Sequence, residues 1–137
     1  DVERSRGLGD VYKRQQLMRP ETVRRAVEPF GRIRYDRLLR LPMRYSRGMM
    51  LGHPAVSLYG HRNALAFGHL GFINILCWAD PERAISVSML TTGKSALGPH
   101  MAPLGRVLGA INNLYAPDVA NIPDWARSLP RGVKAVI

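Results

Sequence analysis

The sequence predicts an α+β domain in which a helix near the C-terminus packs on one face of an antiparallel sheet. Apolar residues alternate with serines over 84–90, just after an apolar run over 72–79 and a turn at Asp80-Pro81. This order of strand, tight turn and strand is typical of an antiparallel hairpin. Apolar residues then recur with helical spacing over 100–114. A helix packed on such a sheet is an α+β arrangement.

The first half of the chain predicts a short helix followed by one strand. Pro20 suits the first turn of a helix, and Pro29 ends it. The arginine-rich stretch 31–42 fits either a short strand or an irregular loop. Alternation over 43–52 predicts a strand, and 53–66 reads as a long loop because it contains proline, glycine and asparagine. Loops of that length are often functional.

The second half predicts two strands, a helix and a tail. The run 72–79 is almost wholly apolar, which favours a strand covered on both faces, and Cys77 within it is expected to be a small buried hydrophobe. The alternation over 84–90 favours a strand with one solvated face. The helix over 100–114 follows, and 115–137, with three prolines and no clear period, is expected to be an extended arm or partly disordered.

Charge leaves two interpretations of the N-terminal half open. The chain of 137 residues has a net charge of +10, and nine arginines between residues 19 and 47 face only three acidic residues. They form either a solvated face or a basic interaction module, over Arg24 to Arg47, that docks an acidic partner. No nucleic-acid motif accompanies them, so nucleic-acid binding is not predicted. No apolar run reaches the roughly 18 residues of a membrane span.

The first fifteen residues (DVERSRGLGDVYKRQ) differ from the rest of the sequence. They show no apolar period, and GLGDVYKRQ resembles translated sequencing adapter, as found at the ends of metagenomic gene fragments. We therefore exclude residues 1–15 from fold reasoning as an artefactual or disordered segment. The native sequence is expected to begin near Gln16, in the middle of a domain.

The stretch 67–82 (FGHLGFINILCWADPE) carries the most specific motif. A Gly-His-x-Gly sequence alone is weak and fits a glycine-lined strand entry equally well. The longer pattern resembles the third conserved element of serine β-lactamases, D-alanyl-D-alanine peptidases and related esterases, where a basic or polar triplet begins the strand that lines the active-site cleft. Here His69-Leu70-Gly71 takes the triplet position, 72–79 the strand and 84–92 its partner. The resemblance covers roughly residues 18–114.

This resemblance implies a serine acyl-enzyme mechanism with defined roles for the triplet. The amide of Phe72 would donate to the oxyanion, and His69 would orient the reacting groups or transfer a proton. Gly68, Leu70 and Gly71 would line the substrate, with the glycines giving its backbone close approach. Leu70 stands where a Thr or Ser usually binds the substrate carboxylate, which implies a neutral small-molecule ester as substrate.

The sequence contains no Ser-x-x-Lys element, which holds the nucleophile and its activating lysine in that superfamily. Residues 16–114 are therefore expected to be the C-terminal part of a serine hydrolase domain that is inactive alone and needs no cofactor. A missing remainder should leave an open apolar face near residues 72–78. No metal site is predicted, because His53, His61 and His69 are spaced by eights, which fits no ligand pattern.

Overall fold

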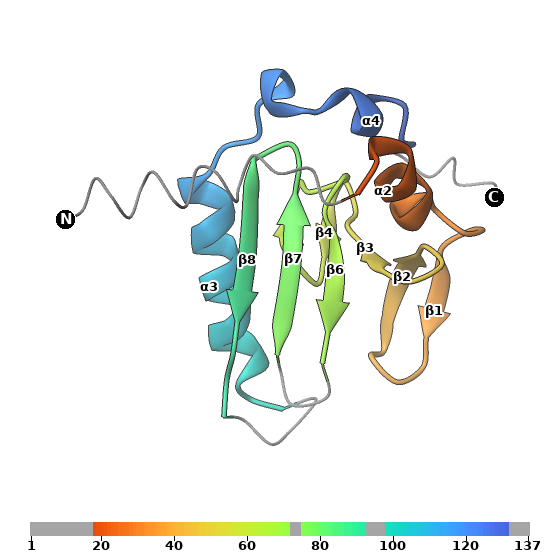
Figure 1. Ribbon diagram of the computed structural model, residues 1–137. Coiled ribbons are helices and arrows are strands. Elements are labelled where there is room, and N and C mark those ends of the chain that lie inside the picture. Colours follow the sequence, from red (N-terminus) through yellow and green to blue (C-terminus); the bar gives the residue numbers. More distant parts are fainter. Residues whose placement is uncertain (1–17, 72–74, 93–97, 132–137) are drawn as a thin grey trace.

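The computed structural model describes residues 18–71, 75–92 and 98–131, and it has the predicted α+β class, including the C-terminal helix. Its main feature is a six-stranded antiparallel sheet in the order β1-β2-β3-β6-β7-β8 (Figure 1). The strands are β1 (Arg34–Asp36), β2 (Leu41–Tyr45), β3 (Met50–Leu51), β6 (Phe67–Leu70), β7 (Leu76–Asp80) and β8 (Ile85–Met89). Within the described ranges, no helix has both the length and the apolar character needed to cross a membrane.

Helix α3 (Met101–Leu114) lies beside β8 (Figure 1), and its apolar side, as the spacing predicted, packs with side chains of β7 and β8. Its buried Leu108 belongs to a core cluster with Tyr59 and Trp78, whose rings stack with centroids 5.8 Å apart. Tyr59 comes from the connection between β3 and β6, which also contains the small hairpin of β4 (Val56–Ser57) and β5 (Gly60–His61). The predicted long loop therefore contributes to the core beneath the sheet.

A second core cluster joins the two ends of the described chain. Helix α2 (Pro20–Val27) contributes Val27, and the segment with the 3₁₀-helix η1 (Val119–Asn121) and helix α4 (Asp124–Arg127) contributes Ile122, Ala126 and Leu129. The side chain of Trp125 packs edge-on against Phe67 of β6. The expectation of an extended arm after residue 115 is thus wrong up to Arg131, where the described part ends.

Two strand predictions are wrong in detail. Residues 43–52 form parts of two strands, because the chain reverses between β2 and β3. The Ser46 hydroxyl accepts the Met49 N–H at 3.0 Å and the Ser46 N–H donates to the Met49 carbonyl at 2.9 Å, which closes this turn. The predicted strand over 72–79 begins only at Leu76 among the described residues, and β6 precedes it as a strand that the sequence did not predict.

The turn between β7 and β8 is held from inside by a buried ion pair. The Arg83 guanidinium donates to the Asp80 carboxylate at 2.7 Å, and both side chains are 1% exposed. Arg83 also donates to the carbonyl of Arg62, at 2.9 Å. From α3, the buried Asn112 donates to the carbonyls of Tyr59 and His61, at 3.1 Å each. The β4–β5 segment is therefore tied to both the turn and the helix.

Candidate functional site

Three polar side chains form a row across the sheet face that α3 does not cover. His69 of β6 pairs in register with Cys77 of β7, and Cys77 pairs with Ser88 of β8. Residues directly opposite each other on neighbouring strands project from the same face. All three are exposed, and the Cys77 Sγ lies 3.2 Å from the Ser88 Oγ. We call His69, Cys77 and Ser88 the polar row.

The prediction that Cys77 is buried is wrong. In β7, Leu76, Trp78 and Asp80 are buried, whereas Cys77 is exposed. The strand is covered on one face only, although its sequence is almost wholly apolar. The alternating serines of β8 could have indicated that Cys77 is exposed. Ser86 and Ser88 show that one face of β8 is solvated, and β7, which pairs with β8, shares that face.

The ring of His69 has a defined tautomer in this arrangement. Its Nδ1 lies 2.9 Å from the carbonyl oxygen of Leu70. A carbonyl oxygen only accepts, so Nδ1 carries the hydrogen, and in the neutral ring Nε2 holds the lone pair. An exposed histidine with this tautomer is able to accept a proton at Nε2 from a group that approaches the sheet face.

The structure separates the other predicted substrate-binding residues from His69. Leu70 pairs with the buried Leu76 and packs on the cluster beneath α3, so its side chain lies on the opposite face of the sheet. Gly68 is buried, and a Cβ at this position would lie 2.1 Å from the Cys77 carbonyl oxygen and 2.6 Å from the Trp78 Cα. The small size of Gly68 therefore has a packing cause.

The triplet lies at the end of a strand, contrary to the prediction that it begins one. His69 and Leu70 are the last residues of β6. The N–H of Gly71 donates to the carbonyl of Ile75 at 2.6 Å, which closes the reversal between β6 and β7. Phe72, the predicted oxyanion donor, lies outside the described residues.

The polar row does not contain an activated serine. The Ser88 hydroxyl contacts the Cys77 thiol, and the His69 Nδ1 bonds to the Leu70 carbonyl, so among the described residues no hydrogen bond joins Ser88 to His69. A serine nucleophile is activated by a base within hydrogen-bond reach. The row therefore offers a proton acceptor, a thiol and a hydroxyl, without a serine paired to His69.

The expected open apolar face is wrong for the described part of 72–78. Leu76 and Trp78 are 1% and 4% exposed. The uncovered face beside them is occupied by the polar row and by Ser86. No large apolar side chain of β7 therefore faces solvent.

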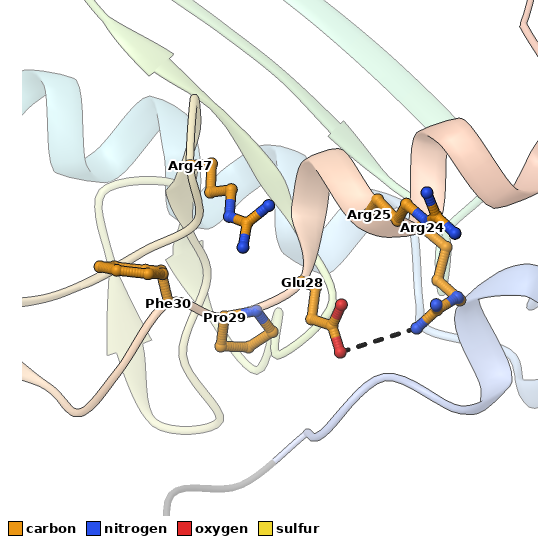
Figure 2. Close-up of a pocket in the computed structure, with 6 residues that line it drawn as sticks. All are labelled: Arg24, Arg25, Glu28, Pro29, Phe30 and Arg47. Atoms are coloured by element: carbon orange, nitrogen blue, oxygen red, sulfur yellow. Dashed lines mark ion pairs between the residues drawn. The ribbon is translucent and has the colours of Figure 1, made fainter.

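Sequence reasoning did not identify a second candidate site, a cavity between α2 and the β2–β3 turn. It has a volume of about 290 Å³ and is lined by Arg24, Arg25, Glu28, Pro29, Phe30 and Arg47. Figure 2 shows the Arg47 side chain between Phe30 and Glu28, with Arg24 beyond Glu28. Arg24 and Arg25 both donate to Glu21, at 2.9 to 3.0 Å, and these bonds lower the pKa of that carboxyl to about 2.

The arginines of the N-terminal half are not all on the surface. Seven are exposed: Arg19, Arg25, Arg32, Arg34, Arg37, Arg40 and Arg47. Arg44 is 6% exposed and donates to the carbonyls of Gly52 and Pro130, at 2.9 Å each. The predicted basic face therefore excludes Arg44, whose role is structural.

Comparisons with known proteins returned no match to a family model, to a curated protein or to a solved structure. Among the described residues, no group of three or more His, Cys, Asp or Glu side chains is placed to hold a metal ion. A functional proposal for this chain therefore rests on the geometry of its own residues.

Proposed function

We propose that this chain supplies the sheet portion of a serine hydrolase site, with His69 as its proton-transferring residue. The observation that carries the proposal is the exposed His69 at the end of β6, on the uncovered face, with its lone pair at Nε2. The motif around it resembles the triplet element of penicillin-binding-protein-like esterases. The nucleophilic serine and its lysine belong to a segment absent from this sequence, so the chain alone is inactive.

The proposed substrate is a neutral small-molecule carboxylic ester. The side chains that share this face of β6, β7 and β8 with His69 are Phe67, Cys77, Ala79, Ser86 and Ser88, none of which carries a positive charge. A site that selects a substrate carboxylate commonly uses a cation or a bidentate donor for it. Leu70, turned toward α3, offers no hydroxyl to such a group. These features favour an uncharged acyl substrate.

The test is to extend the chain with the residues encoded upstream of the codon for Gln16 in its gene. We expect a Ser-x-x-Lys element there, and we expect a fluorophosphonate probe to label its serine in the extended protein but to leave the 137-residue chain unlabelled. H69Q should lower the hydrolysis of p-nitrophenyl esters by about 10²-fold or more, as for loss of a general base. Ser86→Ala, on the same sheet face, is the matched control.

Any one of three outcomes would overturn the proposal: an upstream sequence without a Ser-x-x-Lys element, a serine in that element that the fluorophosphonate does not label, or an H69Q variant that loses no more activity than Ser86→Ala. Measurement of kcat and KM separately distinguishes a proton-transfer role, which lowers kcat, from a loss of substrate binding.

A second candidate function is a non-catalytic basic module that binds an acidic partner. The seven exposed arginines favour it, since they come from one segment of the chain and their charges exceed those of the nearby carboxylates. Electrostatic attraction of this kind increases the association rate and falls with ionic strength. This candidate does not depend on His69.

A further inference from the structure

The tip of the β1–β2 hairpin combines exposed apolar and exposed basic side chains. Figure 1 shows this hairpin at the end of the sheet farthest from α3. Tyr35 is 63% exposed, Leu38 in the connecting turn 73% and Leu41 41%. Arg34 precedes Tyr35, Arg37 and Arg40 lie between the apolar residues in sequence, and all three arginines are exposed as well. We call these six residues the hairpin tip.

The hairpin tip is held in a fixed shape by Asp36. Its carboxylate accepts the N–H groups of Leu38 and Leu39, at 2.9 and 2.8 Å, and the Tyr45 hydroxyl, at 2.6 Å. Arg40, the last residue before β2, has a φ of 56°, which is in the left-handed region. The only carboxylate within the hairpin therefore bonds to groups of the hairpin itself. Because these bonds already order the turn, binding a partner through Leu38 does not have to order it.

Exposed apolar side chains within a cationic rim are typical of an interaction surface. Leu41 pairs with Asp36, the residue that follows Tyr35 in β1. Because successive residues of a strand point to opposite faces, Tyr35 and Leu41 project from opposite faces of the hairpin, on either side of Leu38. A flat protein surface would cover one face and leave the other in water. A partner that the tip enters end-on covers both faces of the hairpin, while the arginines stay at the partner's negatively charged surface.

We propose that the hairpin tip binds the surface of an anionic lipid bilayer. Leu38, Leu41 and Tyr35 enter the interface between headgroups and acyl chains, and Arg34, Arg37 and Arg40 pair with lipid phosphates. Single-stranded nucleic acid fits the tip less well, because Tyr35 is its only aromatic residue and the most exposed side chain, Leu38, has no π-face on which a base could stack. The inference deepens the second candidate function by naming its acidic partner, and it is independent of the hydrolase proposal.

The experiment is flotation of the full chain with vesicles of phosphatidylcholine, alone or mixed with phosphatidylglycerol. We expect binding to the mixed vesicles only, weakened by added salt. The double variant R37Q/R40N should lower the partition coefficient about 30-fold, since each basic residue near an anionic surface contributes roughly fivefold. Asn at position 40 suits the left-handed conformation of this residue. The double variant L38S/L41S should lower it about tenfold or more.

Matched controls lie on α3, at the other end of the sheet. L114S removes a leucine that is 76% exposed, and Arg106→Gln removes an exposed arginine, so neither should change vesicle binding. A Leu38→Trp variant provides a direct measurement when the emission of the unsubstituted chain, from Trp78 and Trp125, is subtracted. The difference should shift to shorter wavelength with mixed vesicles and stay unchanged with phosphatidylcholine alone.

Parallel titrations with poly-glutamate and with a single-stranded RNA separate the possible partners. Equal binding to both kinds of vesicle, or binding that the tip variants lower no more than the α3 controls, overturns the inference. Binding to poly-glutamate or RNA without binding to vesicles also overturns it, and leaves the second candidate function standing. Binding to none of these partners overturns both.

Discussion

Each end of the six-stranded sheet buries one arginine, and the two arginines are stabilised differently. Arg83, beside β7 and β8, pairs with the equally buried Asp80 at 2.7 Å. Arg44, in β2, takes part in none of the ion pairs of the described residues, and its guanidinium is held by the backbone carbonyls of Gly52, Ala64 and Pro130. Burial lowers the pKa of Arg44. One end therefore depends on a charge pair, and the other on carbonyl dipoles contributed by three segments of the chain.

The largest expected effect is that of Asp80→Asn. Removing one partner of a buried ion pair leaves an uncompensated charge, which costs about 3–5 kcal/mol in the free energy of unfolding. The Asp80 Oδ1 also accepts the Glu82 N–H, and the amide oxygen of Asn can keep this bond, so the loss falls on the pair with Arg83. Urea denaturation followed by circular dichroism measures the loss.

Two further variants determine whether this cost is electrostatic. E82Q, in the same turn, removes a more exposed pair with Arg131, 3.8 Å apart, and should cost less than about 1 kcal/mol. The double variant D80N/R83M should be less destabilised than the sum of its single changes, because both charges leave together. Additive losses would show that the charges of Asp80 and Arg83 are not coupled.

Arg44→Met tests the other end, where no carboxylate is left without its partner. Its loss leaves the carbonyls that it contacts without their charged donor, and we expect destabilisation by about 2–3 kcal/mol. Arg47→Met, three residues on and exposed, should change stability by less than about 0.5 kcal/mol. If R44M costs as much as D80N, the proposed difference between the two buried arginines is wrong.

The sequence predicted the elements whose apolar spacing matches a single covered face. Helices α2 and α3 and strand β8 lie where their periodicities placed them, within one or two residues. The prediction of an extended arm after residue 115 is wrong because prolines do not prevent short helices from packing, and the apolar spacing is the stronger signal here. Ile122, Ala126 and Leu129 follow one another at i, i+4 and i+7, which is an amphipathic pattern, and all three are buried.

The candidate site was predictable only in part. The motif identified His69, and the structure leaves this residue exposed on an open face. The motif placed the triplet at the start of the following strand, whereas His69 and Leu70 are consecutive residues of β6, so their side chains point to opposite faces of the sheet. No sequence pattern marked Asn112, which is buried in the last turns of α3 and bonds to carbonyls more than fifty positions earlier in the chain.

A smaller effect is expected from the titration of Asp36, at the β1–β2 end. The Tyr45 hydroxyl and then the Leu39 N–H hold the pKa of this carboxyl below its ordinary value of 3.8. Because the folded-state pKa is lowered, the stabilisation is present above 3.8 and is lost as the pH falls through the folded value. The amide shift of Leu39, followed by NMR, should titrate with a midpoint below 3.8, and in D36N this transition should disappear. A midpoint at or above 3.8 would mean that the hairpin turn does not stabilise the carboxylate.

The smallest effect on stability is expected at the polar row, where the β6–β8 end meets solvent. Cys77→Ser should change the free energy of unfolding by less than about 0.5 kcal/mol, because the side chain is exposed and a hydroxyl retains a hydrogen bond with Ser88. In the folded protein, iodoacetamide should alkylate Cys77 at a rate similar to that in urea. Trp78, its neighbour in β7, is the matched test of the opposite face, since Trp78→Ala should cost about 3 kcal/mol or more. A thiol that reacts only after denaturation would mean that this face is covered in solution, and that His69 beside it is not open to substrate.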